Sequence, residues 1–102
     1  MQSIDIDIPV ELCDDIAHTD TGAQVFVLAL EAAQVDDGSP LALEGSARYM
    51  WRQLTAGPTS VAELAARAAG RYGAAVEDVM PDVQRFVGSL VGRGVLRPAR
   101  AT

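Results

Sequence analysis

The pattern of apolar residues changes from strand-like to helical within residues 40–54, whose sequence is PLALEGSARYMWRQL. Residues 40–43 are a short, mainly apolar run after a turn signal, and this predicts a strand. From residue 44 onward, apolar residues recur at intervals of three and four, which predicts a helix with one apolar stripe. The stripe consists of Ala47, Met50, Trp51 and Leu54. We interpret Trp51 as a core residue rather than a ligand anchor, because large apolar side chains on such a stripe usually pack inward.

Two more helices are predicted downstream. Ser60 and Glu63 have the spacing of a capping box, so the second helix should begin there, and Gly73 should end it. The third helix is expected to begin at Asp78 as its N-cap, which would place Pro81 in the first turn, where proline is tolerated. Either Gly92 or Gly94 should close this helix. Its apolar residues are Val79, Val83, Phe86, Val87, Leu90 and Val91.

The first 35 residues are expected to supply two strands. Isoleucines alternate with aspartates in residues 4–8, and this period of two predicts a half-buried strand that could continue through residues 10–13. Residues 14–22 are polar and turn-like, and the apolar run within residues 23–35 is interpreted as the second strand. Strands followed by helices indicate the α+β class. Three helices with a small β-element also describe a winged helix.

Composition and charge exclude several function classes. The 102-residue chain has a formal net charge of −6, but residues 1–45 hold ten acids and no arginine, whereas residues 46–102 hold all eight arginines and four acids. The acidic half would repel duplex nucleic acid. The longest apolar run, residues 25–30, is too short to span a bilayer, and the single Cys13 fits a reducing compartment. We therefore expect a cytoplasmic protein that binds neither nucleic acid nor a membrane.

The sequence offers little for catalysis. Cys13 and His18 are the only cysteine and histidine, and the acids around them would raise the pKa of the thiol rather than activate it. The acid pairs at residues 14–15 and 36–37 match no metal-binding motif, and the glycines of residues 88–94 do not form a phosphate-binding loop. We expect no enzyme activity, no cofactor and no metal site.

Four stretches of the C-terminal two thirds resemble the PqqD-like family, the small modules called RiPP recognition elements. They are LEGSARYMW at residues 43–51, TSVAEL at 59–64, RYG at 71–73, and DVQRFVGSL at 82–90 followed by RGVL at 93–96. Each stretch alone is common, but their order and spacing together are fairly specific. Glu44 stands where the family usually has asparagine, and the first 35 residues match only in outline.

The resemblance implies a winged-helix-like fold, in which a three-stranded antiparallel sheet packs on three helices that follow it. It also implies a non-catalytic function. The family binds the leader segment of a ribosomally synthesised precursor peptide by β-strand addition, antiparallel along the third strand and against the third helix. Carried over to this chain, the strand contacts are Leu41, Ala42 and Leu43, the groove wall is Val83, Phe86 and Leu90, and the flanking polar residues are Asp82, Arg85, Ser89 and Arg93.

The implied partners are a precursor leader peptide and the enzymes that mature it, either a leader protease and cyclase or a radical-SAM enzyme. We favour the lasso peptide type, because that type commonly keeps this module as a separate chain. Residues 1–96 would form a single PqqD-like peptide-binding domain and residues 97–102 a disordered tail. Pairing of two copies through the third strand would give a homodimer that competes with the leader.

Two other functions are compatible with the sequence. A winged helix-turn-helix DNA-binding regulator would read the major groove with Gln84, Arg85, Ser89 and Arg93 of the third helix, and the helical half is mildly basic. Such a domain should be strongly basic, and this chain as a whole is acidic. Alternatively, the chain could stabilise an enzyme partner without any peptide groove, and groove mutations that leave maturation intact would favour that function.

Overall fold

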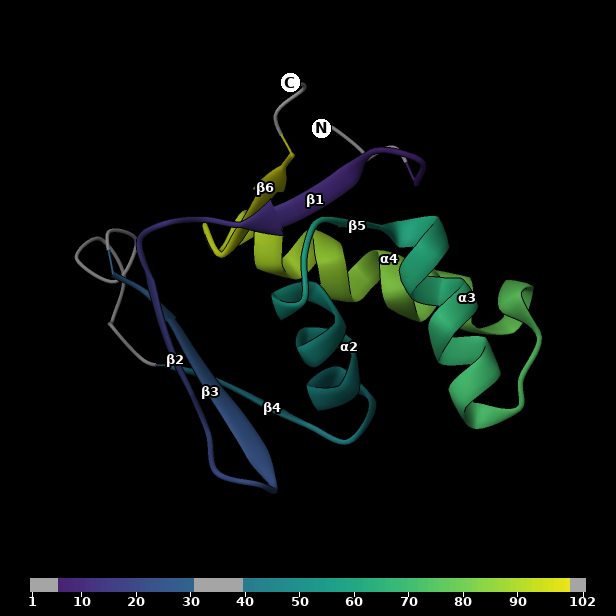
Figure 1. The fold of residues 1–102 in the computed structure, drawn as a ribbon, viewed down its shortest axis with the longest axis horizontal. Coiled ribbons are helices and arrows are strands. Elements are labelled where there is room, and N and C mark those ends of the chain that lie inside the picture. The colour runs from purple at the N-terminus through teal and green to yellow at the C-terminus, as the bar shows by residue number, and fades with distance from the viewer. Residues whose placement is uncertain (1–5, 31–39, 100–102) are drawn as a thin grey trace.

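Two small antiparallel sheets and three helices form the part of the chain that the structure, a computed structural model, describes, namely residues 6–30 and 40–99 (Figure 1). The elements follow in the order β1 (Pro9–Leu12), β2 (Ile16–Asp20), β3 (Gln24–Ala29), β4 (Leu41–Glu44), α2 (Ser46–Thr55), β5 (Thr59–Ser60), α3 (Val61–Tyr72), α4 (Val76–Gly92) and β6 (Leu96–Pro98). The predicted α+β class, with a three-stranded sheet before three helices, is confirmed.

The sheet with the longer strands has the order β2-β3-β4 and is antiparallel throughout. Val25 and Val27 of β3 are buried, and they lie opposite Leu43 and Leu41 of β4. Gly45 then turns the chain from β4 directly into α2 with a φ of 61°, a positive value that favours glycine. The strand–turn–helix connection therefore fixes where β4 lies relative to the helices.

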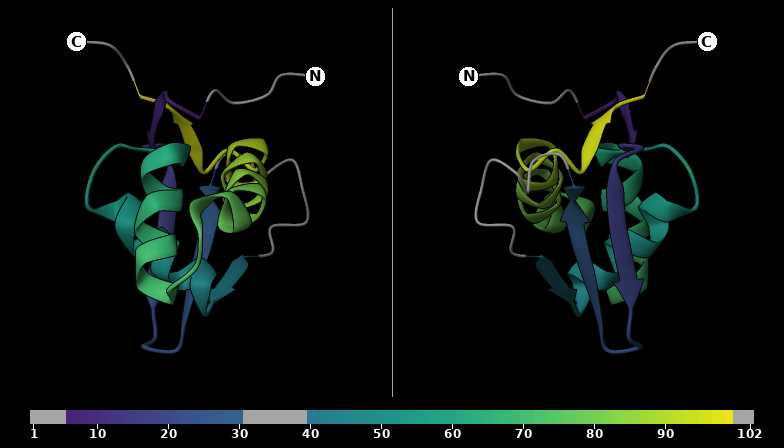
Figure 2. Two further views of the ribbon diagram at one scale, coloured as in Figure 1. Left: turned by 90° about the vertical axis from the view of Figure 1, so that its right-hand side faces the viewer. Right: turned by 90° about the vertical axis from the view of Figure 1, so that its left-hand side faces the viewer.

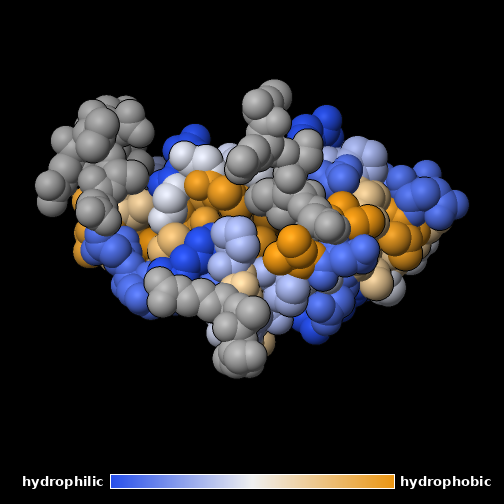
Figure 3. All heavy atoms as spheres, turned by 90° about the horizontal axis from the view of Figure 1, so that it is seen from above, coloured by the Kyte–Doolittle hydropathy of each residue, from blue (hydrophilic) through white to orange (hydrophobic). Residues whose placement is uncertain are grey.

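The second sheet has the order β5-β1-β6 and joins segments that are far apart in the sequence. Val10 of β1 pairs with Thr59 on one side and with Pro98 on the other. The β2–β3 hairpin extends away from this sheet (Figures 1 and 2). On the face seen from above, apolar residues lie among hydrophilic ones rather than in one broad patch (Figure 3). Of the strands in this sheet the sequence predicted only β1, because β5 and β6 have two and three residues and carry no recognisable periodicity.

One hydrophobic core connects both sheets with all three helices. Trp51 is 1% exposed, which confirms it as a core residue. The capping box is also confirmed, because the N–H of Glu63 donates to Ser60 Oγ at 3.1 Å and the Ser60 N–H donates back to Glu63 Oε1 at 3.4 Å. Gly73 ends α3 in a left-handed conformation, as predicted. Other fully buried side chains include Val10, Leu54, Leu64, Val87, Leu90 and Leu96, and burial of each contributes about 1.5–3 kcal/mol.

The strand predictions for the first 30 residues need two corrections. Residues 6–8 form a turn and bend rather than a strand, because the Ile6 carbonyl accepts from the Ala62 N–H at the start of α3 and Ile8 is 44% exposed. Residues 4 and 5 lie outside the described residues, whereas the predicted continuation through residues 10–13 corresponds to β1. Residues 14–22, expected to be a turn, contain β2, whose Ile16 packs against the core. The strand predicted within residues 23–35 is confirmed as β3, but residues 31–35 are outside the described residues.

The start of the C-terminal helix and the tail differ from the prediction as well. The N-cap of α4 is Ala75 and not Asp78, so Pro81 lies inside the helix rather than in its first turn. The earlier start places Glu77 and Asp78 in the first turn, where the helix dipole favours acids. Gly92, one of the two glycines predicted to close the helix, is its last residue. Arg97 and Pro98 belong to β6 and pair with β1, so they are not a frayed tail, while residues 100–102 lie outside the described residues.

Candidate functional site

Strand β4 lies at the edge of its sheet. It pairs with β3 on one side, and among the described residues no strand pairs with its other side. An open edge presents main-chain N–H and C=O groups that can pair with an incoming strand. Which groups β4 presents depends on the direction in which each residue points.

Two hydrogen bonds of the β2–β3 hairpin fix these directions. The Thr21 N–H donates to the Gln24 carbonyl at 2.8 Å, and the Leu30 N–H donates to the Asp15 carbonyl at 3.0 Å. Hydrogen-bonded pairs alternate along an antiparallel ladder, so the even-numbered residues of β3 point their main-chain groups at β2. Val25 and Val27 must then point theirs at β4, where Leu43 and Leu41 lie opposite.

The remaining residues of β4 therefore direct their main-chain groups outward. Ala42 and Glu44 alternate with the leucines that pair with β3, so their N–H and C=O groups point to the free edge. Leu43 is 5% exposed and anchors the strand in the core, and Leu41 packs against the same core cluster. The Ala42 side chain is small and exposed. The three residues predicted to pair with a peptide therefore have two different roles. Ala42 offers main-chain groups to the peptide, and the two leucines hold the strand in place.

The predicted groove-wall residues are not equally accessible. Val83 and Leu90 are 1% and 0% exposed, so they are core residues that present almost no surface. Phe86 is half-buried, and it packs against the core cluster that also contains Leu43. Among the wall residues, only Phe86 stays a candidate for direct contact with a ligand.

The predicted polar flank lies on the exposed side of α4. Asp82, Arg85, Ser89 and Arg93 are all exposed. Arg85 forms an ion pair with Asp82 one turn away. Because this pair is highly exposed, it contributes little to stability and leaves both side chains accessible.

The opposite edge of the sheet, β2, carries polar anchors that the sequence did not reveal. The His18 ring packs edge-on against Trp51 at a centroid distance of 5.4 Å. Asp20 accepts two hydrogen bonds from the Arg48 guanidinium, each 3.0 Å long. The pKa of the Asp20 carboxyl lies below its ordinary value, first because the Gly22 N–H donates to it and then because Arg48 does.

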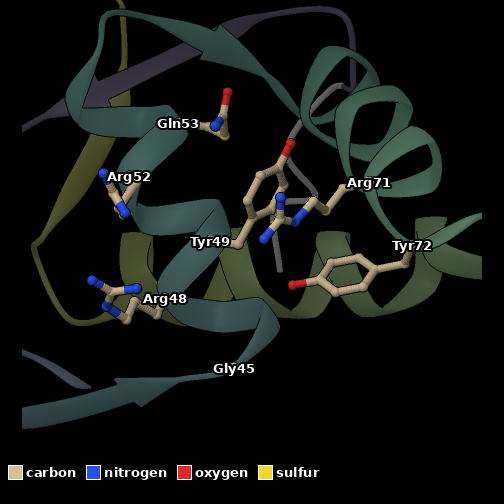
Figure 4. Close-up of a pocket in the computed structure, with 7 residues that line it drawn as sticks. All are labelled: Gly45, Arg48, Tyr49, Arg52, Gln53, Arg71 and Tyr72. Atoms are coloured by element: carbon tan, nitrogen blue, oxygen red, sulfur yellow. The ribbon is translucent and has the colours of Figure 1, made fainter. Parts of the chain in front are cut away.

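A second feature that sequence reasoning missed is a hollow of about 510 Å³ between α2 and the end of α3 (Figure 4). The sequence signal that could have indicated it is arginine recurring at intervals of four in both helices. The residues that line it are Gly45, Arg48, Tyr49, Arg52, Gln53, Arg71 and Tyr72.

The two residues considered for nucleophilic chemistry have separate structural contacts. The Cys13 N–H donates to the Val95 carbonyl, and burial raises the pKa of the Cys13 thiol above its ordinary value. His18 instead packs on Trp51. Within residues 6–30 and 40–99, no three His, Cys, Asp or Glu side chains are grouped so that they could hold a metal ion. No helix of this part of the chain is long and apolar enough to cross a membrane.

Residues 24–96 match the model of the family described as coenzyme PQQ synthesis protein D, PqqD. The chain belongs to the PqqD family. The matched region begins at the first residue of β3 and ends at the first residue of β6, so it contains β4, all three helices and the hollow. The family relationship inferred from four short stretches is therefore confirmed.

The fold of this PqqD-family chain is similar to that of TbiB1, which was solved in complex with the TbiA(beta) leader peptide. The TM-score is 0.73 at 18% sequence identity, and the similarity covers 89% of this chain and 99% of TbiB1. At this identity the similarity establishes the fold alone. No curated protein matches the chain.

Proposed function

We propose that the chain binds the leader segment of a ribosomally synthesised precursor peptide and delivers it to maturation enzymes. The leader would add to the free edge of β4 as a fourth strand, giving the order β2-β3-β4-leader. The observation that carries this proposal is the outward direction of the Ala42 and Glu44 main-chain groups at an edge whose leucines are anchored in the core. The family and the leader-bound TbiB1 support it.

Strand addition would supply most of the affinity through the main chain. The net contribution of each hydrogen bond is about 0.5–1.5 kcal/mol, and main-chain bonds of this kind form whatever the peptide sequence. Selectivity would come from leader side chains that reach Phe86, where burial of an apolar group adds about 1.5–3 kcal/mol before ordering costs. Arg85 and Arg93 would pair with acidic leader residues, and Asp82 and Ser89 would complete the polar flank.

The proposed role is binding and not catalysis. The chain would present the leader to a protease and cyclase of the lasso peptide type, which we favour, or to a radical-SAM enzyme. Because ribosomal precursors are made in the cytoplasm, the proposal places the chain there. Pairing of two chains through β4 would occupy the edge that the leader needs, so a homodimer of this kind should dissociate on leader binding.

The direct test is titration of a labelled leader peptide, taken from a short reading frame next to the gene, followed by fluorescence anisotropy. Ala42→Pro removes an outward N–H but leaves the bonds between β3 and β4 intact, so it should weaken binding at least about tenfold, or 1.4 kcal/mol. Ala42→Ser keeps the N–H and should bind like the wild type. His18→Pro removes an outward N–H at the β2 edge, together with the ring that packs on Trp51, and should leave leader affinity unchanged.

Circular dichroism of each variant would verify that the fold is retained. Equal leader affinity of the Ala42→Pro and Ala42→Ser variants would contradict strand addition at β4. Absence of leader binding, together with salt-sensitive binding to duplex DNA, would replace the proposed function by that of a DNA-binding regulator.

A further inference from the structure

The hollow between α2 and α3 concentrates positive charge in an acidic protein. Its lining includes the guanidinium groups of Arg48, Arg52 and Arg71 and no carboxylate. The chain as a whole has a net charge of −6, but α2 and α3 belong to residues 46–102, which hold all eight arginines and four acids. A hollow lined by one sign of charge attracts groups of the opposite sign.

Two of these three arginines form no ion pair in the described part of the chain. Arg48 is engaged by Asp20 on β2, but Arg52 and Arg71 form no ion pair among residues 6–30 and 40–99. Arg67, one turn before Arg71, differs because it pairs with Glu63 at 3.7 Å and does not line the hollow. Guanidinium groups bind carboxylates through a planar fork of donors. Arg52 acts on Asp20 without forming an ion pair and Arg71 lies over the Tyr49 ring, so both keep N–H donors for a ligand of this class.

Aromatic contacts hold the site in place. The Arg71 guanidinium lies 5.5 Å from the centre of the Tyr49 ring, and the Tyr49 and Tyr72 rings meet edge-to-face at 5.9 Å. The Tyr49 hydroxyl donates to the Arg67 carbonyl at 3.3 Å, which ties α2 to α3. In Figure 4 these side chains lie around the same space, with Arg71 and the two tyrosines together. Positioning before binding reduces the ordering cost that a ligand must offset.

We infer that the hollow is a second docking site, which binds a carboxylate-rich segment of the enzyme that receives the leader. The identity of this partner as a maturation enzyme rests on the proposed function, whereas the choice of carboxylates follows from the arginines. None of the residues that line the hollow belongs to β4 or α4, so leader and enzyme can occupy the chain together. The chain would thereby hold both partners of the maturation step at once.

An acetylated hexaglutamate peptide is the probe, titrated into the full-length chain and followed by NMR of the arginine Nε–H groups and the tyrosine rings. The wild type should show saturable shifts at Arg52, Arg71, Tyr49 and Tyr72. Arg71→Gln should raise the dissociation constant at least about threefold, and Arg52→Gln should act in the same direction. Arg67→Gln is the matched control: it removes the same charge from the same helix and should change the constant less than about 1.5-fold.

Three results would overturn the inference. The first is an equal effect of Arg71→Gln and Arg67→Gln, which would mean that only net charge matters. The second is inorganic phosphate producing the same shifts as strongly as the peptide, which would indicate a small-anion site. The third is a loss of leader affinity in Arg71→Gln, which would make the hollow part of the leader site. If the wild type binds hexaglutamate at the hollow but no leader, the docking site stands and the proposed function fails.

Discussion

The two edges of the β2-β3-β4 sheet are both open among the described residues, yet they differ in what they offer a peptide. At the β2 edge, His18 and Asp20 are tied to α2 through Trp51 and Arg48. At the β4 edge, the small Ala42 directs its main-chain groups outward between two leucines that pack on the core. Free main-chain groups alone therefore do not define a binding edge. The side chains around them decide whether a peptide gains apolar contacts or meets polar groups that are already engaged.

The largest expected effect is a loss of folding stability when the contact between β2 and α2 is removed. Trp51→Ala removes a side chain that is 1% exposed and packs on His18, and it should lower the free energy of unfolding by about 3–5 kcal/mol. Phe26→Ala, at an aromatic that is 37% exposed on the other face of the sheet, should cost about 1 kcal/mol or less. Urea denaturation of both variants measures the difference. Similar losses would mean that β2 does not depend on its contact with α2.

A smaller effect is expected beside the β4 edge. Phe86→Ala should weaken leader binding about three- to tenfold, because the half-buried ring is the proposed apolar contact for the leader. Phe86→Leu retains most of the apolar surface and should bind within about twofold of the wild type. The anisotropy titration measures both variants. If leader affinity is unaffected in Phe86→Ala, the leader lies along β4 without contacting α4.

The smallest effect concerns the ion pair that anchors β2. The pKa of Asp20 is lowered in the folded chain, so its carboxylate stabilises the fold above its unfolded pKa, and this contribution disappears as the pH falls through the folded pKa. Asp20→Asn should therefore melt at a lower temperature than the wild type at pH 7 and at the same temperature at about pH 2. Thermal denaturation at the two pH values tests this. A difference in melting temperature that persists at low pH would assign the effect to packing instead of charge.

The helices were predictable from local signals, whereas half of the strands were not. Ser60, Glu63 and Gly73 mark the ends of α3 by their side-chain and backbone chemistry, which acts within a few residues. Strand β2 was missed because its inward side carries one apolar residue, Ile16, followed by His18 and Asp20. Their partners on α2 are more than 25 residues away, so the pattern of β2 alone contains no strand signal.

The site was predictable only in part, for a related reason. The apolar run after the turn signal predicted β4. Because main-chain groups alternate in direction along a strand, Ala42, between two leucines that pair with β3, directs its N–H and C=O groups to the free edge. An amphipathic helix does not reveal from its sequence which apolar residues stay accessible, so Val83 and Leu90 of α4 were assigned to a groove wall although they are core. The hollow depends on how α2 and α3 pack against each other, and that arrangement is set by the core rather than by the arginines themselves.

Addition of the leader to the β4 edge would change the rates of amide hydrogen exchange along that strand. In the free chain, the N–H groups of Leu41 and Leu43 should already be protected by β3, whereas those of Ala42 and Glu44 should exchange quickly. Saturation with the leader peptide should slow exchange at Ala42 and Glu44 and leave the outward groups of β2, at His18 and Asp20, unchanged. Protection of His18 and Asp20 instead, or of no edge residue at all, would show that the leader does not add to β4.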